Sequence, residues 1–330
     1  MHTHHSHSGQ YVQHAKDTLE EVVAAAEARH FDVFCLTEHM PRYDPSALYP
    51  EELESKTTPA DLVLTFEQYY IHAKAIQEKT NKRRQEQIEK GQNKGEQRIP
   101  QILVGFECEA LSDAYLEHVS NLRATHQFDL FVGSVHHVHG VPIDFDEPLW
   151  LKAAKISSPE GSLEDSARAL FNDYFDLQYK LFIATTPPVI GHFDLIRLFC
   201  PVKQASPETL QTSWPDVWGK IVRNVKYAAA YGALFELNSA AVRKGWPTPY
   251  PGPDIGKLIL ENKGKFCLSD DSHGIAQVGL NYHKSLEYLQ DLGAENLHYL
   301  ALDDSDLSKP ASVHSIPVSS LPNDIFFKSL

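Results

Sequence analysis

Short apolar segments alternate with longer amphipathic segments along most of the chain. In residues 16–29 the apolar side chains recur every three or four positions, as on one face of a helix. Further helices are expected at about 60–90, 163–184 and 215–231. After a histidine-rich start, strands are expected at 31–36, 102–106, 130–135, 188–190, 233–237 and 265–268. Strands that alternate with helices predict an α/β fold, a parallel sheet with helical crossovers.

The positions of the polar residues favour a closed barrel over an open sheet. Each expected strand ends beside a potential metal ligand: His39, Glu107, His136, His192, Asn238 and Asp271. Ligands spread around a ring of strand ends are typical of a TIM-like barrel. An open sheet would gather its site at one switch point, usually with a glycine-rich phosphate turn, and the sequence has neither G-x-G-x-x-G nor a P-loop. We therefore expect one barrel domain over residues 1–330.

One stretch, Lys79 to Arg98, stands apart because it is highly charged and interrupted by glycine. Its composition favours a solvated helix end followed by a mobile loop over a binding arm. We expect it to be a peripheral insertion in the domain.

The net charge, the apolar runs and the cysteines of the chain limit the kinds of molecule that the protein is expected to bind and the compartment in which it is expected to act. The net charge of −14 argues against a nucleic-acid partner, because such binders are usually basic. No apolar run approaches the length of a membrane span, and the first residues lack the features of a signal peptide. The four cysteines are far apart and form no C-x-x-C pair, so reduced thiols are expected. A cytoplasmic protein acting on a small molecule is the expectation, with its oligomeric state open.

Histidine carries the candidate chemistry. The chain has 18 histidines, and five of them fall within the first fourteen residues, interleaved with other residues rather than in a tag-like run. Residues two apart on a strand point to the same face, so His-x-His near the start and Asp271-x-His273 near the end each present two ligands together. Imidazole and carboxylate without thiolate suit zinc, manganese or iron.

Taken in order, these segments resemble the motifs of the PHP (polymerase and histidinol phosphatase) superfamily. Within it, SVHHVHGVPIDF (134–145), GHFDLIRLF (191–199) and ELNSAAVRKG (236–245) look like the histidinol-phosphatase branch. The resemblance spans about residues 1 to 280. The motifs that carry it, besides the first histidine segment, are Thr37-Glu38-His39, Gly105-Phe106-Glu107, Gly133-Ser134-Val135-His136, Gly191-His192-Phe193-Asp194-Leu195 and Ser269-Asp270-Asp271-Ser272-His273.

The resemblance implies a distorted, seven-stranded (β/α) barrel with two or three divalent ions at its mouth. Glu107 would bridge metals. Carried over position by position, the implied ligands are His5, His7, His14, His39, Glu107, His136, His192, Asp271 and His273.

Two register choices affect this set. Both His2-x-His4 and His5-x-His7 fit the first motif, and we favour the second pair because four preceding residues leave room for a strand. Ser8 then follows the second histidine as a hydroxyl residue does in the family, but the choice stays open at this point. At the other end, Asp271 rather than Asp270 stands two residues before His273.

The function implied is a metal-dependent phosphomonoesterase. It would hydrolyse L-histidinol phosphate to L-histidinol and phosphate in histidine biosynthesis, with a metal-activated hydroxide as the nucleophile. His192 and Asp194 are candidates for protonating the leaving alcohol. A phosphate dianion also attracts guanidinium and ammonium groups, and the candidates are Arg197, Arg243 and Lys244.

Three other functions compete. A PHP-type phosphoesterase acting on nucleotides or oligonucleotides would share the metal site, although the acidic composition counts against it. A metal-dependent amidohydrolase would be expected to use a metal-bridging lysine and a different order of ligands. A metal-binding remnant without activity would be expected to lack some of the ligands, whereas every motif position is filled here.

Overall fold

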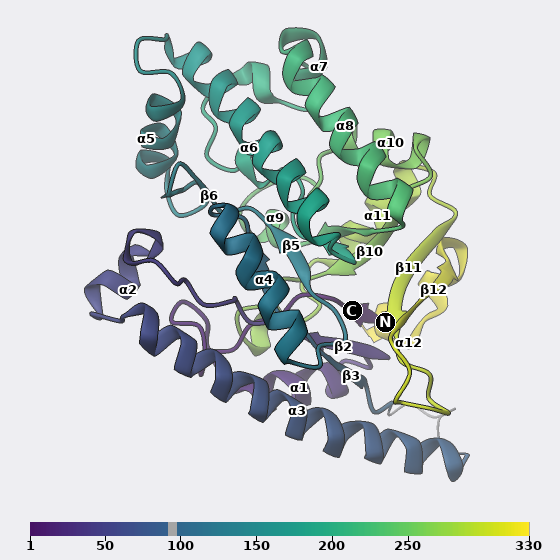
Figure 1. Ribbon diagram of the computed structural model, residues 1–330. Coiled ribbons are helices and arrows are strands. Elements are labelled where there is room, and N and C mark those ends of the chain that lie inside the picture. Colours follow the sequence, from purple (N-terminus) through teal and green to yellow (C-terminus); the bar gives the residue numbers. More distant parts are fainter. Residues whose placement is uncertain (92–97, 330) are drawn as a thin grey trace.

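The structure is a computed structural model that describes residues 1–91 and 98–329 (Figure 1). The helices that form its layers are α1 (Leu19–Ala28), α2 (Pro50–Glu54), α3 (Pro59–Glu89), α4 (Asp113–Thr125), α5 (Glu147–Ser157), α6 (Leu163–Thr185), α7 (Leu210–Ser213), α8 (Pro215–Tyr231), α9 (Ala240–Arg243), α10 (Pro253–Glu261), α11 (Tyr282–Asp291) and α12 (Ile325–Ser329). The strands are β1 (His2–Thr3), β2 (Val33–Leu36), β3 (Gln101–Val104), β4 (Glu107–Glu109), β5 (Val132–Ser134), β6 (His137–Val138), β7 (Val141–Pro142), β8 (Val189–Ile190), β9 (Leu234–Asn238), β10 (Lys265–Ser269), β11 (Asn296–Ala301) and β12 (Ser312–Pro317).

The central strands form two parallel sheets. One has the order β1-β2-β3 and the other the order β10-β9-β8-β5-β4, and the predicted mixed α/β class is confirmed. A closed seven-stranded barrel is not confirmed, because the central strands divide into two sheets that only isolated bridges join. Gly105 lies between β3 and β4, and a Cβ there would come within 2.5 Å of the Leu130 carbonyl oxygen. The close approach of the neighbouring backbone therefore requires glycine.

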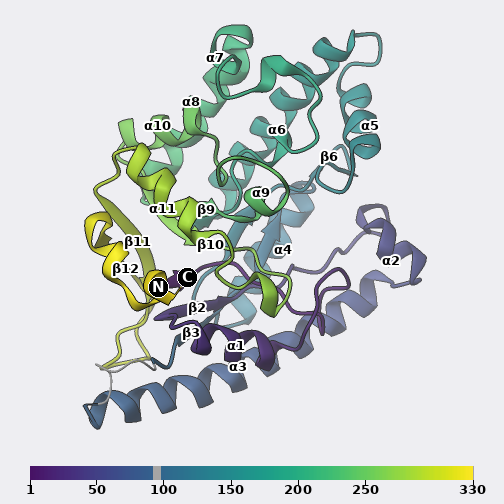
Figure 2. The ribbon, with the colours of Figure 1, turned by 180° about the vertical axis from the view of Figure 1, so that it is seen from behind.

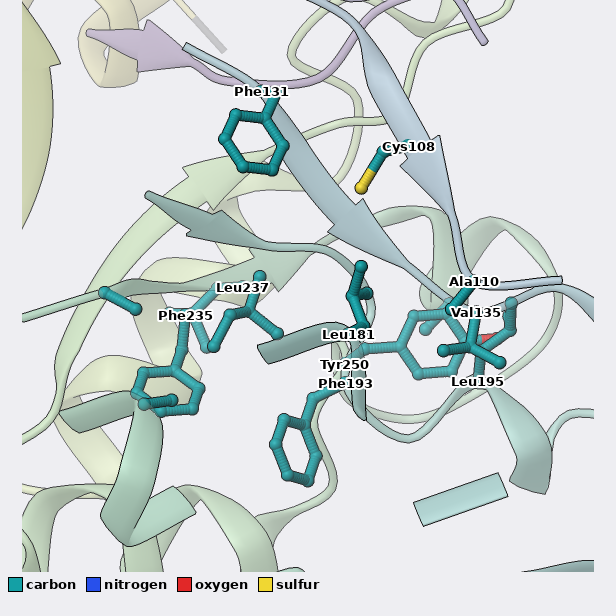
Figure 3. Close-up of a cluster of buried hydrophobic side chains, with 14 of the residues drawn as sticks. Cys108, Ala110, Phe131, Val135, Leu181, Phe193, Leu195, Phe235, Leu237 and Tyr250 are labelled. Atoms are coloured by element: carbon teal, nitrogen blue, oxygen red, sulfur yellow. The ribbon is translucent and has the colours of Figure 1, made fainter. Parts of the chain in front are cut away.

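Side chains on the strands alternate between two apolar layers. Val33 and Cys35 point to an inner cluster together with Leu300 of β11, whereas Phe34 and Leu36 join the larger core beneath the helices. Figure 3 shows part of that larger core, in which Leu181 of α6 lies among side chains from the five-stranded sheet and its neighbouring loops. The inner layer contains side chains from both parallel sheets, such as Leu103 of β3 and Leu234 of β9.

The helices lie outside the sheets, as Figures 1 and 2 show from opposite sides. Helix α6 begins with a capping box in which Ser162 and Asp165 satisfy each other's backbone N–H groups. Helix α8 has Pro215 at its first turn and ends at Gly232, whose φ of 87° suits glycine. These local signals agree with the packing, and the predictions for 163–184 and 215–231 are confirmed.

The charged stretch Lys79 to Arg98 is only partly as predicted. Asn81 is buried and exchanges two hydrogen bonds with the backbone of Ile102, and Arg84 pairs with Asp304 at 2.9 Å. Asn81 and Arg84 therefore contact other segments of the chain, whereas most of the described residues from 82 to 91 are exposed or half-buried, and the expectation of a solvated helix end stays a prediction. Residues 92–97 of the expected loop lie outside the described residues. None of the described helices is long and apolar enough to cross a membrane.

Candidate metal centre

Glu107 stands at the centre of a cluster of histidines at the carboxyl ends of the parallel strands. Its side chain is buried, and Oε2 lies 2.8 Å from His39 Nδ1 and 3.1 Å from His5 Nε2. Its other oxygen, Oε1, lies 3.1 Å from His192 Nε2 and 3.2 Å from His136 Nε2. One carboxylate thus faces ligands that come from four different strand ends.

On the Oε2 side, the first histidine motif meets the last motif of the ring. His5 and His7 lie two residues apart on one face, with their Nε2 atoms 3.1 Å from each other. Asp271 Oδ1 lies 3.5 Å from His7 Nε2 and 3.8 Å from His5 Nε2. A parallel bridge between Ser6 and Ser272 brings these two motifs together.

A second group surrounds the other carboxylate oxygen. His136 and His192 also have their Nε2 atoms 3.1 Å apart, both beside Glu107. A third group joins His7 to His39 and His273 at the entrance of the site. The nitrogen or oxygen atoms of each of these groups, and of His5-His7-Glu107, lie within 4.8 Å of one another.

His14 lies at the rim. Its ring centroid is 4.9 Å from that of His273 and 5.8 Å from that of His39, but its Nδ1 lies 3.1 Å from Glu51 and its side chain is 40% exposed. The structure therefore brings His14 next to the cluster without placing it in any of the three groups.

Two carboxylates behind the histidines were missed by the sequence analysis. Glu236 Oε1 lies 3.1 Å from His5 Nδ1, and Glu38 Oε2 lies 3.2 Å from His7 Nδ1. Each carboxylate accepts the Nδ1 proton, which fixes the tautomer and leaves Nε2 as the lone-pair donor. The signal available was position: Glu38 stands beside His39 in a quoted motif, and Glu236 opens another.

The donor set fits divalent cations. With Nδ1 of His5 and His7 engaged by carboxylates, their Nε2 lone pairs face each other at 3.1 Å, which is unfavourable without a positive charge between them. Two imidazoles bound to one zinc at about 2.0–2.1 Å place their nitrogens about 3.3 Å apart in tetrahedral geometry. Glu107 Oε2 is buried and accepts no hydrogen bond from the described residues. The cluster is therefore arranged for cations.

The electrostatics of the cluster also favour positive charge. Burial lowers the pKa of His7, but hydrogen bonds to Asp271 and Glu38 outweigh burial and raise the pKa to about 9. For His136, burial is likewise outweighed by Glu107, and the pKa rises to about 9. The pKa of Glu107 is held well below its usual value by the neighbouring histidines despite its burial. Protons and metal ions compete for such sites.

The alternative first pair, His2 and His4, lies outside the cluster. His2 Nε2 accepts the Leu268 N–H at 3.0 Å. His4 Nδ1 donates to the Leu268 carbonyl at 3.1 Å, and its Nε2 accepts the Leu300 N–H at 3.0 Å. The structure thus brings His5 and His7, the favoured pair, to the site.

A cavity of about 530 Å³ opens above the cluster. Arg243 and Lys244 line it, as expected of phosphate contacts, and the Arg243 guanidinium donates to the backbone oxygens of Asp270 and Asp271 at 3.4 and 3.2 Å. Its remaining lining residues are Gln13, His14, His39, Tyr49, Glu51, Glu107, His136, Asp144, Phe145, Asp271, His273 and Gln277.

Two predicted site residues are placed elsewhere. Arg197 is buried and donates to both Asp254 oxygens, at 2.9 and 2.6 Å, and to Asp194 at 2.9 Å. Asp194 is fully buried and also accepts the Gly252 N–H. Neither residue lines the cavity, so the structure does not bring Arg197 to a phosphate or Asp194 to a leaving group; they form a structural ion pair instead.

Other residues near the cluster have positioning contacts. Asp270 accepts N–H groups from Ser272 and Gly279, so its carboxylate is engaged by the backbone next to the cluster. Glu109 is hydrogen-bonded to His137, and its Oε1 also lies 3.8 Å from Nδ1 of the cluster histidine His136.

Comparisons with known proteins agree with this geometry. The PHP domain family model matches residues 3–240. A Schizosaccharomyces pombe protein named "Probable histidinol-phosphatase" is 42% identical over 293 residues, covering 89% of this chain and 87% of that protein. The Saccharomyces cerevisiae histidinol-phosphatase is 32% identical over 355 residues, covering 100% of both chains.

A solved structure shows the same fold. It is the histidinol phosphate phosphatase from Lactococcus lactis complexed with zinc, L-histidinol and phosphate, and it superposes with a TM-score of 0.55 at 15% identity, covering 88% of this chain and 93% of that chain. The predicted resemblance is confirmed. The chain belongs to the PHP domain family.

Proposed function

We propose that this protein is a histidinol-phosphatase, hydrolysing L-histidinol phosphate to L-histidinol and phosphate in histidine biosynthesis. The observation that carries the proposal is the set of three donor groups around Glu107 at the floor of the cavity. The two yeast relatives, which bear this activity in their names and match most of the chain, support it. The zinc, L-histidinol and phosphate in the Lactococcus lactis structure are compatible with the same fold serving this reaction.

The ligands we propose are those the motifs indicated: His5, His7, His14, His39, Glu107, His136, His192, Asp271 and His273. When bound, two or three zinc, manganese or iron ions supply charge neutralisation for the phosphoryl oxygens and lower the pKa of a water nucleophile. Glu236 and Glu38 orient His5 and His7 through their Nδ1 atoms. His14 enters this set through its place at the rim, where a small side-chain movement would turn it towards His273.

Arg243 and Lys244 are proposed to bind the phosphate from the wall of the cavity. Both lie on or directly after α9, which follows β9, and no acidic side chain of the described residues forms an ion pair with either of them. Their positive charge is therefore available to a dianion, unlike that of Arg197. Of the two candidates for protonating the leaving alcohol, His192 touches the cluster and Asp194 does not. We propose His192 as a metal ligand.

We also propose that the two sheets act as one distorted barrel in a single domain. Isolated parallel bridges, His39 to Glu107 and Ser6 to Ser272, connect the sheets at both of their junctions. These junctions carry the ligands that share Glu107. An amidohydrolase would be expected to use a metal-bridging lysine, whereas the side chain that His5, His39, His136 and His192 share here is the carboxylate of Glu107.

Phosphate release tests the proposal. Purified protein would be assayed with L-histidinol phosphate, AMP, a short oligonucleotide and an aryl phosphate, with manganese or zinc and then with a chelator. We expect chelator-sensitive turnover that is fastest with L-histidinol phosphate. Turnover confined to the nucleotides would instead support the nucleotide phosphoesterase, and no phosphate release from metal-loaded protein would contradict the proposal.

A further inference from the structure

One acid in the cavity has no cation to pair with. Asp144 follows β7 and lines the cavity beside Tyr49 and Phe145. Its Oδ1 is buried and accepts no hydrogen bond from the described residues, and none of their cationic side chains forms an ion pair with it. A buried carboxylate oxygen without a donor is unfavourable, and a ligand that donates hydrogen bonds would relieve it.

The other acids that line the cavity are already engaged. Glu51 lies 3.1 Å from His14 Nδ1, and Glu107 and Asp271 lie among the cluster histidines. Asp144 therefore differs from the rest of the lining: its charge contributes to the raised pKa of His136, but none of the described histidines forms an ion pair with it, and its Oδ1 has no hydrogen-bond donor.

The charges of the cavity also come from different parts of the five-stranded sheet. Arg243 and Lys244 follow β9, whereas Asp144 belongs to the segment after β5, and β8 lies between β5 and β9 in the sheet. A ligand with an anion at one end and a cation at the other matches this arrangement. Next to Asp144, Phe145 is 44% exposed although it is a large apolar side chain, and it offers its ring to the cavity lining.

We propose that Asp144 binds the ammonium group of the substrate and that Phe145 packs against the substrate's imidazole ring. The inference rests on the proposed function, because L-histidinol phosphate carries a phosphate at one end and an amine and an imidazole at the other. Asp144 and Phe145 are then specificity-determining residues, which select an amino-imidazole ester among the many phosphomonoesters that the cluster could hydrolyse.

The test compares two substrates in two proteins. The substrates are L-histidinol phosphate and its deamino analogue, in which hydrogen replaces the amino group; the proteins are wild type and Asp144→Asn. A charge-assisted hydrogen bond to a buried carboxylate predicts that Asp144→Asn lowers kcat/KM for L-histidinol phosphate by about 10- to 100-fold, mainly through KM. The value for the deamino analogue should change by no more than about twofold.

A matched control separates recognition from charge and folding. Glu147, three residues further on, is exposed and outside the cavity lining, so Glu147→Gln removes the same charge without touching the subsite. It should leave the preference for the amine unchanged. Metal content and circular dichroism of Asp144→Asn should equal those of wild type.

Several outcomes would overturn the inference. Equal loss on both substrates would show that Asp144 serves folding or a shared step. The same loss of preference in Glu147→Gln would assign the effect to net charge. Wild-type protein that hydrolyses both phosphates equally well would refute amine recognition but leave the proposed function intact, whereas protein that hydrolyses neither would refute the proposed function itself.

A second variant tests the ring contact independently. Phe145→Leu keeps an apolar side chain but removes the flat surface, so KM should rise for L-histidinol phosphate. It should stay unchanged for an amino alcohol phosphate that lacks the imidazole. An equal rise for both would contradict the role of Phe145.

Discussion

The N-terminal segment carries two pairs of histidines, His2 with His4 and His5 with His7, and the two pairs lie in different environments. His4 is bonded on both ring nitrogens to backbone, to the Leu268 oxygen at 3.1 Å and the Leu300 N–H at 3.0 Å. His5, the next residue, is bonded to a carboxylate through Nδ1, while its Nε2 faces His7 and Glu107. Burial is the same for both, so burial alone does not make a histidine a ligand.

The difference lies in what surrounds the second nitrogen. Burial lowers the pKa of His4 to about 4, so His4 is a neutral part of the fold. At His7 the neighbouring carboxylates overcome burial and raise the pKa to about 9. A buried histidine whose free nitrogen is directed at carboxylates and other imidazoles marks a cation site, and one whose nitrogens are both bonded to backbone marks a structural position.

The largest expected effect comes from the centre of the cluster. Glu107→Gln removes the charge that five histidines face, so cations should bind weakly and activity should fall by roughly 10³-fold, corresponding to several kcal/mol of transition-state stabilisation. His4→Gln, the control, should keep the activity of wild type per folded, metal-loaded molecule. Steady-state phosphate release checks both, and equal losses in the two variants would contradict the contrast between the two sets.

The next effect is on stability and its pH dependence. The pKa of His4 is about 4 in the folded state against an ordinary value of 6.5, so the unfolded state binds more protons between these values. The contribution of neutral, buried His4 to the free energy of unfolding is therefore complete above pH 6.5. It is lost as the pH falls towards 4, by roughly 3 kcal/mol at most. Urea unfolding of metal-free wild type and His4→Gln over this range measures it. The free-energy gap between the two proteins should narrow on acidification; a widening gap would be the wrong sign.

A smaller effect is expected one contact away from the ions. Glu38→Gln keeps the shape of the side chain but weakens the hold on His7 Nδ1, and a loss of about 10- to 100-fold in metal affinity is expected. Titration with zinc followed by calorimetry measures the affinity. Glu20→Gln, an exposed acid on α1, serves as the control, and an affinity of Glu38→Gln equal to wild type would exclude the orienting role.

The smallest effect on activity is expected at Arg243, and a comparison with Arg197 separates the roles of the two arginines. Arg243→Gln should lower kcat/KM by about tenfold through loss of a phosphate contact, with little change in stability. Arg197→Gln should chiefly destabilise the fold by about 3–5 kcal/mol, because it leaves buried Asp194 and Asp254 without their partner. Kinetics and urea unfolding of both variants distinguish the two roles; an unchanged stability of Arg197→Gln would contradict them.

These contrasts show what the sequence could reveal of the fold. Helices α6 and α8 were predictable because capping, amphipathic period and packing agree locally. The division of the strands into two sheets was not predictable, because strand pairing depends on contacts between segments far apart in sequence, such as the close approach of Gly105 to the Leu130 backbone.

The same holds at the site. The ligand candidates were predictable because they sit at strand ends in motifs, and the structure gathers all of them except His14 within three donor groups or beside them. The supporting roles were not predictable, because they depend on contacts between residues far apart in sequence. Glu236 is hydrogen-bonded to His5, and Arg197 is paired with Asp254, 57 positions away. A guanidinium in a motif looks the same in sequence whether it is free or paired.

Metal content tests the central claim most directly. Wild type, His4→Gln and His7→Gln would be loaded with zinc, freed of excess metal and measured by mass spectrometry of the element. We predict that His4→Gln retains the zinc stoichiometry of wild type, whereas His7→Gln, which lies in two of the donor groups, loses at least one ion per chain. Unchanged zinc in His7→Gln, or loss of zinc in a folded His4→Gln, would contradict the assignment of the two sets.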